Sequence, residues 1–89
     1  MEPRISSLSI EAERLFLFGM SQNKGHFSIQ AWQKEEVACG REAPTETGLA
    51  LMQEIRAAGL MTHADHVTAL GDWAFRHYND EVDLLRRAL

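Results

Sequence analysis

Two histidines and a carboxylate lie close together in the second half of the chain, at His63, Asp65 and His66. Imidazole nitrogens and carboxylate oxygens are zinc ligands, but a structural zinc site normally has four of them. The other candidate ligands, His77 and Cys39, are far away in the sequence. We therefore interpret the two histidines as exposed side chains and predict no metal and no other cofactor.

Covalent and acid–base catalysis have equally little support. Cys39 paired with a histidine would form a nucleophile and its base, but no glycine-rich oxyanion loop flanks it. We interpret it as a small, half-buried hydrophobic side chain. The adjacent acids Glu35 and Glu36 point in different directions on a helix, so we interpret them as a solvated face. No phosphate-binding glycine loop is present, and we do not expect an enzyme.

Composition is typical of one small globular domain: 89 residues, of which 45% are hydrophobic and 25% charged. A single cysteine cannot form an internal disulfide, which predicts an intracellular, cytoplasmic protein. No apolar run approaches the roughly 20 residues of a membrane span, and no signal peptide is visible at the start, so we expect no membrane partner. Residues 1–8 are predicted to be a tail docked by Ile5 and Leu8, and residues 9–89 a single domain.

Two helices are predicted in the first half of the chain. The first covers residues 9–21, with Ser9 as its N-cap and acidic residues in its first turn; Gly25 follows its end. The second covers residues 29–39 and is capped by Ser28. Its predicted packing residues are Ile29, Trp32 and Val37.

A turn over residues 40–44 leads to a third predicted helix over residues 45–58. Gly59 suits its C-terminal end. Gly48 inside it costs about 1 kcal/mol relative to alanine, and either permits close approach of another helix or is a plain defect. Its apolar positions are Leu49, Leu51, Met52 and Ile55. Leu51 and Met52 each lie at a helical spacing from Ile55, so one stripe should face a core.

The last helix is predicted over residues 69–88, with Thr68 as its cap. Residues 61–63 and 66–68 before it indicate a very short hairpin, and residues 26–28 a minimal strand. Twenty helical residues span roughly 30 Å, more than so small a core needs, so the distal half would seek a partner surface. The apolar stripe, in which Trp73 is predicted to be core, consists of Leu70, Trp73, Ala74, His77, Tyr78, Val82, Leu85 and Leu89.

This order of elements resembles a winged helix-turn-helix domain. Residues 52–61 resemble the end of that family's recognition helix, and residues 67–71 (Val-Thr-Ala-Leu-Gly) resemble the step from its wing into its last helix. Residues 26–28 stand where its first strand would be, and the similarity covers about residues 9–80. The resemblance implies a mainly α, winged-helix-like fold with four helices and a minimal β-hairpin. A small helical bundle is the alternative.

The winged-helix family commonly inserts its third helix into the major groove of DNA. Over residues 42–66, however, four carboxylates stand against Arg56 alone, a net charge of −3. Duplex DNA is bound mainly through arginine and lysine contacts, so this face would repel it. A dimeric DNA-binding transcription regulator is therefore the second hypothesis. Its nucleic-acid-binding residues would be Lys34, Arg41, Thr45, Thr47 and Arg56.

The leading hypothesis is a small acidic regulatory or adaptor protein that binds another protein, or itself as a homodimer, through the last helix. Such a protein could also occlude a basic, nucleic-acid-binding surface on its partner. Phe75 and Tyr78, three residues apart, could be exposed aromatic anchors of an interface; alternatively, Phe75 packs against the first helix. The predicted partner-binding residues are Phe75, Tyr78, Val82, Leu85 and Leu89.

Overall fold

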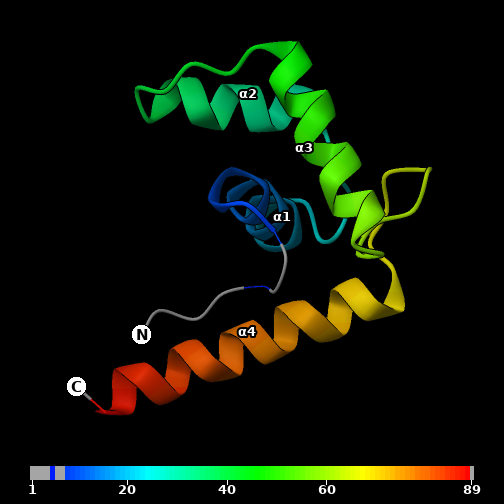
Figure 1. Ribbon diagram of the computed structural model, residues 1–89. Coiled ribbons are helices and arrows are strands. Elements are labelled where there is room, and N and C mark those ends of the chain that lie inside the picture. Colours follow the sequence, from blue (N-terminus) through cyan, green and yellow to red (C-terminus); the bar gives the residue numbers. More distant parts are fainter. Residues whose placement is uncertain (1–4, 6–7, 89) are drawn as a thin grey trace.

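Four helices make up most of the computed structural model, which describes residue 5 and residues 8–88 (Figure 1). The chain is mainly helical, as the sequence predicts. Contacts join α1 to both α2 and α3, and α2 to α3. In Figure 1, α4 runs on the side of α1 opposite to α2, and its C-terminal half extends away from the hairpin-like turn before it. The helices are α1 (Ile10–Gln22), α2 (Ile29–Ala38), α3 (Thr45–Ala57) and α4 (Ala69–Ala88).

Three of the four helices begin at the side-chain caps that the sequence predicts. Ser9 and Ser28 each accept a hydrogen bond from the backbone N–H three residues later, at 3.2 and 3.3 Å. Thr68 does the same at the start of α4, at 3.0 Å. These caps satisfy N–H groups that the first helical turn leaves without partners. Helix α3 instead begins after Pro44, with no side-chain cap.

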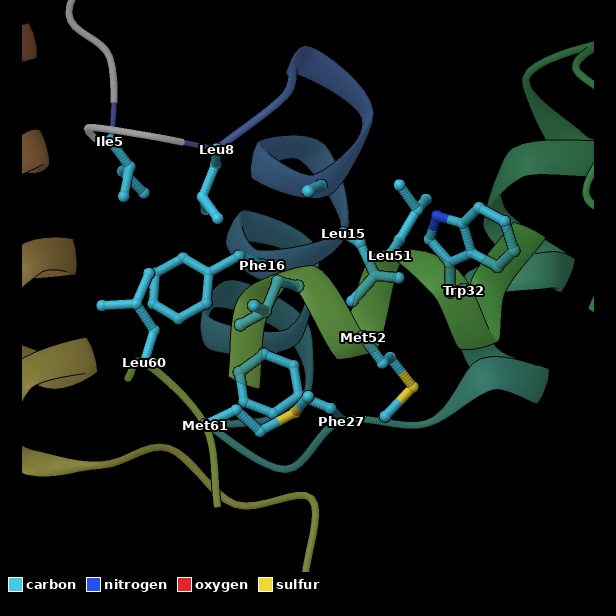
Figure 2. Packing of buried hydrophobic residues seen from close by; sticks show 12 residues of the cluster. Ile5, Leu8, Leu15, Phe16, Phe27, Trp32, Leu51, Met52, Leu60 and Met61 are labelled. Carbon is cyan, nitrogen blue, oxygen red and sulfur yellow. The ribbon is translucent and has the colours of Figure 1, made fainter. Parts of the chain in front are cut away.

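One apolar core joins residues from α1, α2, α3 and the segments between them (Figure 2). Phe16 of α1 stacks on Phe27, with ring centroids 5.7 Å apart. Ile5 and Leu8 are buried in the same core, as predicted for the docked tail. The buried apolar residues are Ile5, Leu8, Ala12, Leu15, Phe16, Phe27, Trp32, Leu51, Met52, Ile55, Leu60 and Met61.

The predicted hairpin is reduced to isolated antiparallel bridges. Met61 is bridged to Val67, and His26 to His66. The described residues contain no strand, since each paired segment is too short to extend the ladder. Asp65 turns the chain between the paired segments with a positive φ of 62°. A helical, bundle-like fold is thus observed, whereas a winged helix with a β-hairpin is not confirmed.

The face that α2 turns inward differs from the prediction. Val37 was predicted to pack, but its side chain is 65% exposed. The residues that face inward are Ile29, Trp32 and Glu36, at steps of three and four. Cys39, predicted to be half-buried, is exposed at the end of the same helix.

Gly48 permits close approach of α2 to α3. A Cβ at this position would lie 3.0 Å from Cζ3 of Trp32 and 3.3 Å from Cγ2 of Ile29. The glycine therefore has a packing reason that compensates for its low helix propensity.

Ser9 also connects two helices that are far apart in the sequence. Its backbone N–H donates to Oε2 of Glu54 at 2.6 Å, and its hydroxyl donates to Oε1 at 3.0 Å. The carboxylate of Glu54, on α3, thus lies at the positively polarised start of α1.

Replacing Ser9 with alanine removes the cap and one of these hydrogen bonds. We expect the free energy of unfolding to fall by about 1–2 kcal/mol, measured by urea denaturation. Ser21→Ala on the exposed side of α1 is the control, and should change stability by less than about 0.5 kcal/mol. Equal effects of the two variants would contradict the capping role.

Candidate interaction surface

The inward face of α4 holds the helix against the core. Gly71 is buried, and Ala74, Phe75 and Tyr78 are half-buried and pack against the core cluster. Thr68 fixes the first turn, since its hydroxyl donates to the carbonyl of Gly59 at 2.6 Å and accepts from the N–H of Gly71. Of the two alternatives for Phe75, packing on the core is therefore observed.

The outward face of α4 carries large apolar side chains with no cover from the described chain. Leu70, Trp73 and Leu84 are 51%, 61% and 63% exposed. With His77 they follow one another at steps of three, four and seven residues, so they lie on one side of the helix. We call Leu70, Trp73, His77 and Leu84 the outer stripe. The prediction that Trp73 is a core residue is wrong, because the inward stripe lies on the other side of the helix.

Trp73 and His77 form the centre of the outer stripe. Their rings are stacked with centroids 5.1 Å apart and an interplanar angle of 6°. Nε2 of His77 lies 3.1 Å from Oε1 of Glu81. The indole is thus supported on one face while most of its surface remains open to a partner. Large, rigid aromatic side chains of this kind supply much of the binding energy of protein interfaces.

The predicted partner-binding residues are divided between two environments. Phe75 and Tyr78 pack against the core, and Val82 is half-buried. Leu85, further along α4, is exposed. Leu89 lies outside the described residues. The apolar surface that remains open is therefore centred on Trp73 and Leu84, which the sequence assigned to the core or left out of the site.

The residues named for nucleic-acid binding are mostly occupied by contacts within the chain. Arg41 is paired with Glu36 at 2.6 Å, and Arg56 with Asp65. Thr45 accepts a hydrogen bond from Gln33 at 3.0 Å. Lys34 and Thr47 are exposed, and within residues 8–88 Lys34 is the one cation of this set that has no ion pair. The set therefore presents little positive charge to a phosphate backbone.

Glu36 is the centre of a buried ionic cluster. Its side chain is 3% exposed, and its two oxygens bind Arg14 of α1 at 3.0 Å and Arg41 at 2.6 Å. Burial raises the pKa of the Glu36 carboxyl, but the hydrogen bonds and charges of Arg41 and Arg14 outweigh burial and lower the pKa below its ordinary value. The hydrogen bond to Glu36 likewise raises the pKa of Arg41. The interpretation of Glu36 as part of a solvated face is wrong.

A pocket of about 300 Å³ lies between the start of α2 and the exposed side of α3. Its lining includes Ile29, Leu49, Met52, Arg56 and Asp65. Nε of Arg56 is buried without a hydrogen-bond partner in the described chain, but Asp65 already neutralises the guanidinium. The pocket therefore has little net attraction for an anion.

His63 and His66, which were considered as metal ligands, lie in or near the bridged segments. The rings of His66 and His26 are 4.7 Å apart and tilted by 53°, and His63 is exposed. In the described part of the chain, no three side chains from His, Cys, Asp and Glu come together as a possible metal site. Cys39 lies near a carboxylate, with its Sγ 3.7 Å from Oε1 of Glu35.

No helix within the described residues combines the length and apolar character that crossing a membrane requires. Comparisons of the chain with protein-family models, with curated proteins and with solved structures find no match.

Proposed function

We propose that the chain is a small regulatory or adaptor protein that acts by binding a protein through the outer stripe of α4. The single observation that carries this proposal is Trp73, a large aromatic residue that is 61% exposed between two exposed leucines. Large apolar side chains that gather on one exposed helix face are unfavourable in water and support an interaction site there. The ring of His77 holds the indole in one orientation, which lowers the entropy lost on binding.

A winged-helix-like scaffold is part of the same proposal. The two antiparallel bridges, His26 to His66 and Met61 to Val67, support it because they join the segments where the resemblance expects a first strand and a wing. The third helix of such a scaffold would be α3. Its one cation, Arg56, is paired with Asp65, and Arg41 in the turn before it is paired with Glu36, which favours protein docking over DNA reading.

The test compares proteins retained by immobilised full-length chain with those retained by two variants. Trp73→Glu places a charge in the outer stripe and should abolish retention of the specific partner. Val37→Glu is the matched control, because Val37 is equally exposed on α2, and it should retain that partner. Circular dichroism should show that both variants are folded.

Two results would contradict the proposed function. One is a partner that Trp73→Glu retains as well as the unchanged chain does. The other is the absence of any protein partner together with a shift of duplex DNA at about 50 mM salt that Arg41→Ala or Arg56→Ala weakens.

A further inference from the structure

We infer that the partner on the outer stripe is a second copy of this chain, with the two α4 helices side by side and antiparallel. This inference rests on the proposed function and names its partner. Four observations carry it: the spacing of the stripe, the charges beside it, the absence of competing contacts, and the length of the helix.

The stripe has the spacing of a helix-pairing seam. Leu70, Trp73, His77 and Leu84 occupy a and d positions of a seven-residue repeat, the pattern by which two helices interlock their side chains. Asp80 occupies the remaining d position between His77 and Leu84. When two such helices run antiparallel, Trp73 of one copy faces Leu84 of the other, His77 faces Asp80, and Leu70 faces Arg87 at the edge of the seam. Because the dimer is symmetric, each Trp73 indole packs against a Leu84 side chain. Each Asp80 carboxylate likewise lies opposite a His77 imidazole.

The charges beside the seam favour this orientation. Along α4 the sign changes from acidic Asp72 to basic Arg76, then to three acids within residues 80–83, and finally to basic residues 86–87. In the antiparallel pair, Arg76 lies opposite Asp83 of the second copy. In a parallel pair, each charged residue within 80–83 would instead lie near the same residue of the second copy. The same would hold for residues 86–87. A parallel pair would bring Arg76 near Glu81, but it would also set Asp80 against Asp80 of the second copy inside the seam. Since like charges across such a seam oppose pairing, the charges favour the antiparallel pair.

These charges are free to make such contacts. Within residues 8–88, no ion pair is formed by Asp80, Asp83, Arg86 or Arg87. Arg76 makes one ion pair, to Asp72 in the preceding turn at 3.1 Å, in which Arg76 is largely exposed and Asp72 about half exposed. An exposed pair of this kind contributes little stability, so it does not prevent Arg76 from reaching Asp83 of a second copy.

The length of α4 fits the same arrangement. Its 20 residues extend roughly 30 Å. Its first half packs inward through Gly71, Phe75 and Tyr78, while Leu84 and Leu85 in its second half remain exposed. An antiparallel pair covers the exposed second half of each copy with the anchored first half of the other.

The first test is sedimentation velocity of the full chain over a range of concentrations. We expect a monomer–dimer equilibrium for the unchanged chain, and a dissociation constant at least about tenfold higher for Trp73→Gln. Val37→Gln, which changes an equally exposed residue outside α4, should leave the constant unchanged. A chain that stays monomeric at all concentrations, or a dimer that Trp73→Gln does not weaken, would overturn the inference.

The orientation is tested by exchanging charges. Arg76→Asp alone and Asp83→Arg alone each create like-charge contacts in the antiparallel pair, and should weaken the dimer. The chain with both changes restores opposite charges and should dimerise better than either single variant. If the double variant dimerised no better than the single variants, the antiparallel arrangement would be overturned. A parallel pair predicts no such recovery of dimerisation, because residues 76 and 83 would not lie opposite each other.

These results separate the inference from the function on which it rests. A monomeric chain whose retained protein partner is lost in Trp73→Glu would overturn self-association and leave the proposed function standing. A dimer that dissociates in Trp73→Gln would support the inference even if no other protein were retained.

Discussion

Replacing Glu36 with glutamine is expected to lower the free energy of unfolding by about 2–3 kcal/mol at neutral pH. The carboxylate is buried and binds Arg14 and Arg41 from two different parts of the chain. A neutral amide has one oxygen in place of two and carries no charge, so both arginines lose the opposite charge and one of them loses its hydrogen-bond acceptor. The expected loss is below that of a fully buried ion pair, because the two guanidinium groups are partly exposed and can be hydrated.

The same variant should alter the dependence of stability on pH. The pKa of Glu36 is lower in the folded chain than its ordinary value, which is about 4.3 in an unfolded chain. Its contribution to stability is therefore complete above that value, and is lost as the pH falls from it through the folded pKa. In Glu36→Gln this part of the acid-induced loss should be absent. The measurement is urea denaturation at a series of pH values between about 3 and 7.

Glu35→Gln is the matched control for this prediction. Glu35 is the preceding residue, is exposed, and makes a weak contact with Cys39 at 3.7 Å. Its replacement should change stability by less than about 0.5 kcal/mol. If the two variants behaved alike, or if Glu36→Gln kept the full acid dependence, the ionic cluster would not contribute as described.

The helices could be predicted from sequence because their ends depend on local signals. Ser9, Ser28 and Thr68 are side-chain caps that act within one turn, and α4 has the predicted bounds, Ala69–Ala88. The other helices end within one or two residues of their predicted ends. The bridged segments were found as well, but no strand forms in the described chain, because a ladder needs more paired residues than these segments have.

The orientation of helix faces could not be predicted as well. Val37 and Trp73 were expected to pack because they are apolar, yet both point outward. Helix α4 has apolar residues on two sides, and only contact with the core decides which side is buried. Similarly, Glu36 appeared to be a surface acid, since its partners Arg14 and Arg41 are 22 and 5 residues away. Contacts between residues of different elements leave no local pattern in the sequence.

The candidate site was predicted only in part for the same reason. The sequence named α4 as the helix with unused apolar length, and α4 does carry exposed apolar residues. It selected the stripe through Phe75 and Tyr78, which the core uses in its first half. The charge argument against a DNA-binding third helix needed only composition, and the pairing of Arg41 and Arg56 adds a further reason.

Replacing Gly71 with alanine is expected to destabilise the chain by about 2–3 kcal/mol, although alanine is the better helix former. A Cβ at position 71 would overlap the backbone carbonyl oxygen of Leu60 and lie 2.7 Å from Cγ2 of Val67. A backbone oxygen cannot move aside as a flexible side chain can, so α4 would have to shift away from the core. Forced overpacking of this kind typically costs 1–3 kcal/mol.

The sign of the change in the free energy of unfolding tests this explanation. At a helix position with free space, glycine to alanine should stabilise by about 1 kcal/mol. Gly40→Ala is the control, because a Cβ there meets no atom within 4 Å and its cost comes only from a positive φ of 81°. That cost should be about 1 kcal/mol. Stabilisation by Gly71→Ala in urea denaturation would show that α4 does not lie as close to Leu60 as described. Destabilisation would show that close approach at Gly71 holds the inward face of α4 against the core and leaves its outer stripe turned away from it.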